Sequence, residues 1–424
     1  MKTIYSLKSL LSVRMPLFVF AITFCAYACT TPSIEPNPYA ITTPQTGSRK
    51  ELTLDSIFLY ANQIYLWRSN LPSYEVFNPR GKYKNISPER TAYQRALYDL
   101  TQYGRNIAGA PYEWTPYEGH AKYSYLEDAT SYNSSYSATS ATTDTYITHR
   151  QYWPLPQGTV AYLYLSSFPT LVDVQHELDR VFADFTVRGI THLIIDLRHN
   201  AGGFVESAAY LADLIAPANL TGKKMFSEQF NEVVRAGKAS LLTKQLYRDA
   251  QGNPVLFNGR LATMADVDYR EDANTHYFSK KGTLNSIKHV SFLVSARTAS
   301  ASELLISCLK PYLPTTLIGQ QTYGKPIGFF PIYIDQYCIY LSSFLLRNAD
   351  GWSDYFQGLT VDIPTEEDES GIPIGSVQEP LLSAALKAID PKLLKTAVFL
   401  PKADTLTVCT LQANVTVKTK FSLR

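Results

Sequence analysis

The sequence has little net charge, few cysteines and no recognisable metal motif. Its 424 residues carry 39 Lys and Arg against 37 Asp and Glu, a formal net charge of +2, which points neither to a nucleic-acid partner nor to an acidic one. The seven histidines show no His-Glu-x-x-His spacing and the five cysteines are scattered, so we predict no metal. Gly-x-Gly-x-x-Gly spacing is also missing around Asn200–Gly203, which removes the usual phosphate-cradling loop. No cofactor is therefore expected.

A long hydrophobic run is missing too. The apolar stretch Met15–Ala28 has 14 residues, which is too short to span a bilayer as a helix. It follows three basic residues and ends in small residues before Cys29, so residues 1–29 are predicted to be an export signal. The ending Ala26-Tyr-Ala-Cys29 is similar to a lipobox, and this predicts lipidation of Cys29 and a lipoprotein of the cell envelope, anchored in the membrane and facing the periplasm or cell surface. The alternative is a secreted protein cut near Cys29. With Cys25 removed and Cys29 acylated, three cysteines remain, so no disulfide framework is expected.

Composition and periodicity divide the rest of the chain. Residues 30–50 are rich in Pro, Thr and Ser and are predicted to be a flexible tether. Residues 51–104 are predicted to be a helical N-terminal domain, with one helix over Leu54–Trp67 and a second from the serine cap of Ser87-Pro-Glu89 to Tyr103. Residues 105–158, including the Ser/Thr/Tyr-rich stretch Ser131–Tyr146, show no sustained period and are expected to form a loop region.

From residue 159 to 390 the pattern alternates between short apolar strands and amphipathic helices. Helices are expected along Val174–Phe185, over Val205–Ile215 and over Ala301–Leu309. The strands expected between them are Val160–Leu165, Leu193–Ile195, Val290–Val294, Thr316–Ile318, Phe329–Ile334 and Cys338–Leu346. This order predicts an α/β core. Residues 391–424 are expected to add edge strands, because polar and apolar residues alternate over Leu406–Val417.

The chemistry is indicated by a serine and a lysine in the core. Ser300 lies in Arg297-Thr-Ala-Ser-Ala-Ser-Glu303 at the start of an apolar helix, and Lys325 follows 25 residues later in Gln321-Thr-Tyr-Gly-Lys325. A serine hydroxyl needs a base, and a lysine serves only if its surroundings keep part of it neutral. A helix start also offers free N–H groups to a developing oxyanion. The pair therefore predicts a hydrolase of acyl bonds.

A third segment extends this pattern. His192–Asp196 has the features of a buried strand, followed by the turn Leu197-Arg-His-Asn-Ala-Gly-Gly203. With its turn, its Ser-Ala-Ser-Glu segment and its Thr-x-Gly-Lys segment in this order, the chain resembles the C-terminal processing peptidases, or tail-specific proteases, over roughly residues 155–390. The resemblance implies a serine peptidase with a crotonase-like spiral core of ββα units.

Carried over residue by residue, the resemblance makes Ser300 the nucleophile and Lys325 the general base. It assigns the oxyanion hole to the backbone N–H groups of Gly203 and Ala301. Glu303 and Thr322 match supporting positions. The glutamine that many members place four residues after the lysine is Phe329 here. A Ser-Lys dyad is therefore expected, with the third member missing or supplied from elsewhere.

The chain also departs from the family in what precedes the core. Members usually carry a peptide-binding PDZ domain there, and only about thirty residues separate Lys122–Asp128 from the first core strand, too few for that domain. We therefore expect a PDZ-lacking envelope type with a polypeptide substrate, no nucleic-acid partner and no dependence on a free C-terminus.

Other interpretations compete with the dyad. Ser302 also precedes the helix, but its spacing to Lys325 does not match. Ser307-Cys-Leu-Lys310 fits the Ser-x-x-Lys pattern of penicillin-recognising enzymes, yet the Lys-Thr-Gly strand is missing. His199, in the glycine turn, is an alternative base. A non-catalytic ligand- or peptide-binding protein on the same fold is the alternative function.

Overall fold

The structure is a computed structural model that describes residues 39, 41–129, 146–249, 252–367, 371–394 and 421–423. The chain divides into two units, residues 1–40 and residues 41–424, and the second contains all described helices and strands. The predicted export signal with Cys29 lies outside the described residues, as does the Leu406–Val417 stretch of the tail. No helix in the described ranges combines the length and apolar character needed to cross a bilayer.

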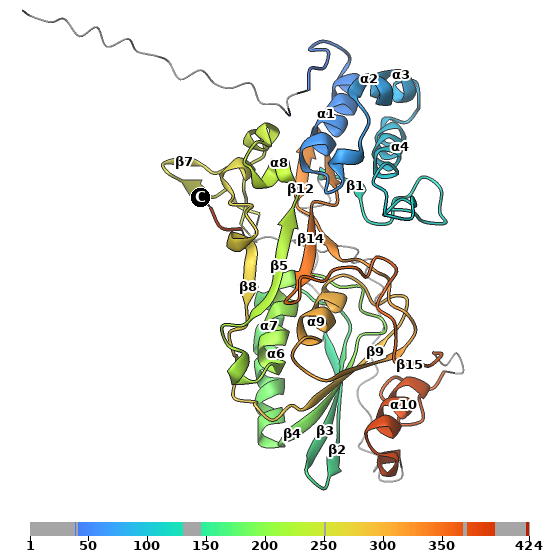
Figure 1. The fold of residues 1–424 in the computed structure, drawn as a ribbon, viewed down its shortest axis with the longest axis vertical. Helices are drawn as coiled ribbons and strands as arrows, with labels where there is room; N and C mark the ends of the chain where they lie inside the picture. Colours follow the sequence, from blue (N-terminus) through green and yellow to red (C-terminus); the bar gives the residue numbers. More distant parts are fainter. Residues whose placement is uncertain are drawn as a thin grey trace, which may run out of the picture. The chain divides into compact units, whose positions relative to one another are not determined.

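The largest sheet of the second unit has six strands and lies in the lower part of the view in Figure 1. Its strand order is β15-β10-β9-β4-β3-β2, and all neighbours pair in parallel except the β2–β3 hairpin. Parallel neighbours need crossover connections, which helices supply. The strands are β2 Ile147–Leu155, β3 Gly158–Leu165, β4 Ile190–Asp196, β9 His289–Val294, β10 Thr315–Gly319 and β15 Ile363–Pro364.

Helices cover both faces of this sheet. Helices α6 (Leu171–Val187) and α7 (Val205–Ile215) lie on one side, and α10 (Pro380–Ile389) lies on the other (Figure 1). On the α10 side, alternate residues of β3, namely Val160, Tyr162 and Tyr164, pack with Leu382 and Leu386. The buried side chains of α6 are the set whose helical spacing predicts that face: Val174, Leu178, Val181, Phe182 and Phe185.

Two smaller antiparallel sheets stand beside the core. One has the order β11-β14-β5-β8 and the other β1-β13-β12. Their strands are β1 Tyr125–Asp128, β5 Lys224–Phe230, β8 Thr275–Tyr277, β11 Ile327–Gly328, β12 Pro331–Ile334, β13 Tyr337–Tyr340 and β14 Phe344–Asn348. Helix α9 (Ala301–Leu309) contacts β14 and β5 of the first small sheet and helix α7 of the core. A short hairpin joins β6 (Leu256–Phe257) and β7 (Arg260–Leu261), and α8 (Glu232–Arg235) follows β5.

The N-terminal region of the unit is helical. It contains α1 (Arg49–Ile64), α2 (Tyr74–Phe77), α3 (Pro79–Tyr83) and α4 (Glu89–Thr101). Ser48 and Glu51 form a capping box at the start of α1, which satisfies N–H groups that have no partner inside the helix. Helix α4 differs from the prediction at its start, because Pro88 is the N-cap and no side chain caps it. Ser87 therefore does not serve as the cap.

The mixed α/β core with a helical N-terminal region is as predicted. Two segments differ from their expected structure. Residues 105–158, expected to form a loop, contain β1 and the whole of the hairpin strand β2. The expected strand over Cys338–Leu346 is two strands, β13 and β14, and these pair in different sheets. Leu341–Ser343 form the break, and they carry the chain from one sheet to the other.

Candidate active site

Ser300 lies between β9 and α9, in a backbone conformation that is rare for a residue with a side chain. Its φ of 64° and ψ of −117° place it outside the regions that L-residues normally occupy. Its hydroxyl Oγ is fully buried and has no hydrogen-bond partner among the described residues. A strained backbone that presents an unsatisfied hydroxyl is a feature of functional sites rather than of ordinary helix caps.

The glycine turn that follows β4 lies directly against Ser300. Gly202 has a φ of 105°, and a Cβ built on it would lie 2.7 Å from Ser300 Cβ and 2.9 Å from the Ala301 nitrogen. At Gly203, where φ is 139°, a Cβ would lie 1.9 Å from the carbonyl oxygen of Phe168. Both positions therefore require glycine, because any side chain would push the turn away from α9.

The two N–H groups predicted to form the oxyanion hole come from this contact. Phe168 donates to Gly202 O and accepts from Phe204 N, both at 2.9 Å, which leaves the N–H of Gly203 directed away from Phe168. Ala301 is the first residue of α9, so its N–H has no acceptor inside the helix. The glycine turn thus lies against the first residue of α9, at the positive end of the helix.

Glu303 joins the serine segment to the lysine segment. Its carboxylate is fully buried and accepts four hydrogen bonds. Oε2 accepts from the backbone nitrogens of Ser300 (2.9 Å) and Lys325 (2.8 Å), and Oε1 accepts from Thr322 Oγ1 (2.5 Å) and Gly324 N (2.7 Å). Burial raises the pKa of Glu303, and these four donors oppose that rise. The predicted supporting pair, Glu303 and Thr322, therefore makes direct contact.

Lys325 is only 4% exposed. Burial lowers its pKa from 10.5 to about 7, and the charges of Glu303 and Glu113 partly offset this effect. Its Nζ lies 4.8 Å from the centre of the Phe329 ring. Phe329 thus places an aromatic ring face at the position where the resembling family often has an amide.

The Asp-Leu-Arg part of the turn motif is structural. Arg198 is buried and bonds Asp196 through Nε (2.9 Å) and Nη2 (2.8 Å), and Glu379 through Nη1 (2.6 Å) and Nη2 (2.8 Å). Tyr162 OH also donates to Asp196 at 2.7 Å. Glu379 in turn caps α10 by accepting from the N–H groups of Leu381 and Leu382. These hydrogen bonds connect the glycine turn to α10, which lies on the other face of the sheet from α6 and α7.

The competing serine and the histidine lie in other contacts. Ser302 Oγ donates to the backbone oxygen of Asn200 at 3.0 Å, and this bond helps to fix the glycine turn. His199 bonds to Tyr164 OH through Nδ1 (3.4 Å) and to Glu367 through Nε2 (3.3 Å). The ring therefore pairs with groups other than Ser300.

The Ser-x-x-Lys pair on α9 is not assembled as a site. Ser307 is buried on the helix, whereas Lys310 is exposed, with its Nζ 5.9 Å from the Trp352 ring. Cys308 is buried between them, and burial raises the pKa of its thiol well above the ordinary value, as in a core side chain rather than a nucleophile.

One charged residue near the lysine was missed by sequence reasoning. Glu113 is fully buried and accepts from Ser124 N (2.7 Å), Ser124 Oγ (2.8 Å), Ser342 Oγ (2.9 Å) and Tyr123 N (3.3 Å). It lies in a stretch without periodicity, so no local signal marks it. A buried carboxylate in an expected loop can be recognised only when the residues around it are known.

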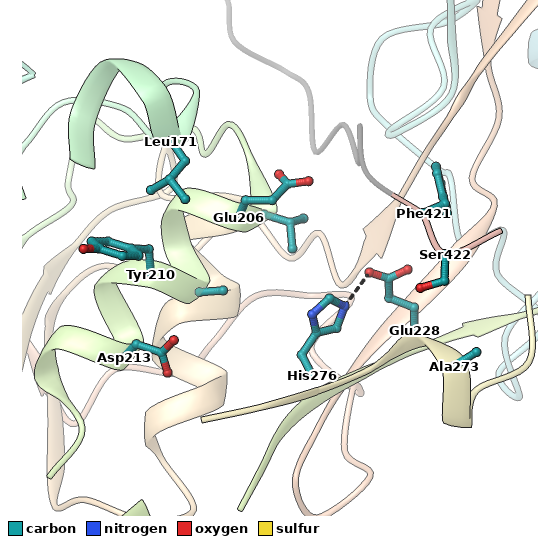
Figure 2. A pocket seen from close by; sticks show the side chains of 11 residues that line it. Leu171, Glu206, Tyr210, Asp213, Glu228, Ala273, His276, Phe421 and Ser422 are labelled. Atoms are coloured by element: carbon teal, nitrogen blue, oxygen red, sulfur yellow. Dashed lines mark hydrogen bonds and ion pairs between the residues drawn. The ribbon is translucent and has the colours of Figure 1, made fainter. Parts of the chain in front are cut away.

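A pocket of about 370 Å³ opens along helix α7 (Figure 2). Val205 and Glu206 line it from the first turn of the helix, after Gly203 and the N-cap residue Phe204. Figure 2 shows His276 paired with Glu228 on its other side, at 3.2 Å. The remaining lining residues are Leu171, Ala209, Tyr210, Asp213, Ala273, Phe421 and Ser422. In the described part of the chain, no group of three or more His, Cys, Asp or Glu side chains could hold a metal ion.

Comparison with known proteins identifies the core. Residues 159–364 match the model of peptidase family S41. No curated protein matches the chain by sequence. A protein from Bacteroides fragilis that is proposed to be an S41 protease is similar in structure, with 24% sequence identity and a TM-score of 0.46. The match covers 58% of this chain, and this chain spans only 58% of the length of that protein. The photosystem II D1 C-terminal processing protease has 13% identity over 80% of this chain and 98% of its own, with a TM-score of 0.44. A lipoprotein from Streptococcus agalactiae has 14% identity over 82% and 98%, with a TM-score of 0.45.

Proposed function

We propose that the protein is a serine endopeptidase that cleaves polypeptides with a Ser300–Lys325 dyad, because residues 159–364 match the model of peptidase family S41. The observation that carries the proposal is the state of Ser300, whose backbone is strained and whose buried hydroxyl has no partner among the described residues. A serine that served only as the N-cap of α9 would need neither a strained backbone nor a buried hydroxyl without a partner. Lys325, with a pKa of about 7, supplies a base that is partly neutral at neutral pH.

In the proposed reaction, neutral Lys325 accepts the hydroxyl proton of Ser300 as Oγ attacks the scissile carbonyl carbon. The carbonyl oxygen becomes an oxyanion and accepts hydrogen bonds from the N–H groups of Gly203 and Ala301. Protonated Lys325 then gives its proton to the departing amine, and an acyl-enzyme forms on Ser300. Water, deprotonated by the same lysine, hydrolyses the ester and restores both groups.

Glu303 and Thr322 position the dyad and neither form nor break a covalent bond in the proposed reaction. Glu303 holds the backbones of Ser300 and Lys325 through one oxygen atom, and Thr322 holds the other oxygen. Since Ser300 is fully buried, an extended substrate must displace the side chains that cover Oγ before attack. The pocket along α7 is lined by Val205 and Glu206, which follow Gly203 by two and three residues in the chain, and we propose it as a position for a substrate side chain.

Export and lipidation belong to the same proposal. The basic residues, the apolar run and the Ala26-Tyr-Ala-Cys29 ending support a lipid anchor on Cys29, which would hold the peptidase at the cell envelope. Metabolic labelling with a palmitate analogue tests this part. The wild type should be labelled and Cys29→Ser should not; an unlabelled wild type would leave only a secretion signal.

The experiment that tests the catalytic proposal compares two serines on the same segment. Ser300→Ala should abolish cleavage of an unfolded protein such as casein and should also prevent labelling by an active-site-directed serine reagent. Ser302→Ala is the matched control, because it removes a hydroxyl two residues away that bonds Asn200 O. It should retain the labelling. If Ser300→Ala stayed active, or if the folded wild type neither cleaved nor reacted, the peptidase proposal would fail and the binding-protein alternative would gain.

A further inference from the structure

The strongest unexplained feature near the candidate site is Glu113, a fully buried carboxylate that takes no part in the proposed bond changes. It lies outside the segment that matches the S41 family. A buried charge carries a large desolvation cost unless it is well paired. The buried carboxylate of Glu113 therefore needs partners that offset this cost.

The contacts show that Glu113 clamps residues 122–124. Its backbone oxygen accepts from Lys122 N at 3.0 Å, and its side chain accepts from the backbone nitrogens of Tyr123 and Ser124 and from Ser124 Oγ. Three successive residues are thus fixed by one glutamate. Ser342 Oγ completes the set from the segment between β13 and β14.

Residues 122–124 in turn cover the lysine segment. Tyr123 OH donates to the backbone oxygen of Gly324, the neighbour of Lys325, at 2.5 Å. Tyr323 OH donates to Lys122 O at 2.9 Å. The Tyr123 ring also belongs to the same buried cluster as Phe329, whose ring faces Lys325 Nζ. Tyr123, which Glu113 holds, therefore contacts Gly324 on the N-terminal side of Lys325 and packs in one cluster with Phe329 on its C-terminal side.

The hydrogen bonds are arranged for the ionised form of Glu113. Oε2 faces two backbone N–H groups, which can only donate. Ser124 Oγ already accepts from Ser342 N at 3.0 Å, so its proton is directed to Oε1. Burial raises the pKa of Glu113, and these donors oppose the rise. A network of donors around a carboxylate favours the charged state.

We propose that Glu113 is a positioning residue for the dyad, which holds residues 122–124 against the Gly324–Lys325 backbone and adds a second buried carboxylate to the surroundings of the lysine. The proposal rests on the proposed function, in which Lys325 is the general base. Burial alone would leave a lysine that is neutral but too weakly basic to take the serine proton, since a base works best when its pKa is near the working pH. Glu303 and Glu113 both counter that burial.

Several other ionisable groups surround the pair. Glu303 faces Lys325 from α9, Tyr65 faces Glu113 from the end of α1, and Tyr123, Tyr323 and Tyr355 lie in the same region. Burial raises the pKa values of these tyrosines, so they do not titrate near neutral pH. Burial also lowers the pKa of Lys122, so a lysine titration has to be identified with a Lys325 variant before it is attributed to Lys325.

The test variant is Glu113→Gln, which keeps the shape and removes the charge. Its oxygen can still accept from the two backbone N–H groups, and its NH₂ can donate to serine hydroxyls that rotate. Loss of a nearby negative charge lowers the pKa of Lys325, so the acid limb of the kcat/KM profile should move to lower pH by about half a unit or more. The plateau should fall by roughly two- to tenfold because the base is weaker. Glu118→Gln, an exposed change in the same segment, is the matched control and should leave both unchanged.

A second measurement does not depend on activity. In the Ser300→Ala protein, the NMR titration of labelled lysine, assigned by Lys325→Arg, reports the midpoint of Lys325 directly. Glu113→Gln should lower that midpoint. If this variant does not fold, Ser342→Ala removes one donor to the carboxylate, favours its protonation and should give a smaller shift in the same direction.

The outcomes separate the two proposals. If the wild type shows no Ser300-dependent cleavage while the Lys325 midpoint still moves, the proposed function fails and the action of Glu113 on Lys325 stands. If cleavage depends on Ser300 but both the acid limb and the Lys325 midpoint stay within about 0.2 unit in the folded variants, Glu113 is only a structural residue and the inference is overturned.

Discussion

The Oε2 atom of Glu303 accepts the backbone N–H of Lys325 at 2.8 Å and, on the same oxygen, that of Ser300 at 2.9 Å. One atom therefore fixes the spacing of the two segments that carry the proposed dyad. Three of the four donors on this carboxylate are backbone N–H groups, which cannot reverse their direction. An amide in place of the carboxylate would direct its NH₂ against at least one of them.

This arrangement predicts that Glu303→Gln is severe although it is nearly isosteric. Leaving a buried N–H unsatisfied costs about 1–3 kcal/mol, so the free energy of unfolding should fall by that amount. Values of kcat/KM should fall about 10²-fold or more as the dyad loses its spacing. Thr322→Val should show a milder form of both losses, because it removes one donor to Glu303 and the acceptor for Leu359 N. Thr322→Ser keeps the hydroxyl and is the control; chemical denaturation and peptide kinetics provide the measurements. Wild-type kinetics in Glu303→Gln would contradict the role of this carboxylate.

The lowered pKa of Lys325 predicts how kcat/KM depends on pH. The base must be neutral, and burial brings its pKa to about 7. As pH falls through this value the amine becomes protonated, so kcat/KM should fall below pH 7 and reach its plateau above about pH 8. Lys325→Arg keeps the charge but cannot deprotonate, so it should lose about 10²–10⁴-fold, nearly as much as Lys325→Ala. Near-normal turnover of the arginine variant would exclude the lysine as base and direct attention to His199.

Asp213 predicts a pH effect on stability that is independent of catalysis. Burial raises the pKa of this carboxyl from 3.8 to about 6, although it accepts from Ser279 N at 2.7 Å. Between these values the folded state holds a proton that the unfolded chain has released, so its contribution to stability is lost as pH rises toward 6 and above. Asp213→Asn keeps the acceptor and has no such loss. Its stability relative to wild type should increase by about 1–3 kcal/mol between pH 4 and pH 7.

The comparison for Asp213 is made by denaturant unfolding across that range. Asp350→Asn, a change at an exposed position, serves as the control and should show no such trend. A flat difference between Asp213→Asn and wild type would mean that Asp213 is ionised in the folded protein throughout the range.

Local patterns are sufficient for the elements next to the candidate site. Helices α7 and α9 have the predicted bounds, Val205–Ile215 and Ala301–Leu309, because a glycine turn and a serine cluster mark where each begins. The buried face of α6 follows from its 3.6-residue period. The spacing of the Ser, Gly and Lys segments predicts the site residues, and in the structure Gly202 lies against Ser300 while Glu303 accepts from the backbone N–H groups of Ser300 and Lys325.

Local sequence patterns do not show which distant segments pair with one another. Strand β1 pairs with β13, Tyr125 opposite Tyr340, and this long-range contact brings Glu113 and Tyr123 to the lysine segment. Nothing near Glu113 in the sequence signals that partner. The depressed pKa of Lys325 has the same origin, since burial by residues from several sheets sets it. Electrostatics at this site is therefore a property of the tertiary structure.

The last prediction concerns how substrate is held. Residues 104–128, before the core, make turns and one strand, β1, in the part of the chain that the structure describes, and we expect no PDZ domain to capture a substrate tail. Binding energy from a remote module normally helps to align the scissile bond. Without it, alignment must come from the core, and cleavage of extended polypeptides should be weak and independent of the C-terminus. Peptides that differ only in a free apolar, an acidic or an amidated C-terminus should give kcat/KM values within about tenfold of one another, a limit of about 1.4 kcal/mol in transition-state binding. A stronger preference for the free apolar end would contradict this expectation and would show that tail recognition survives without such a domain.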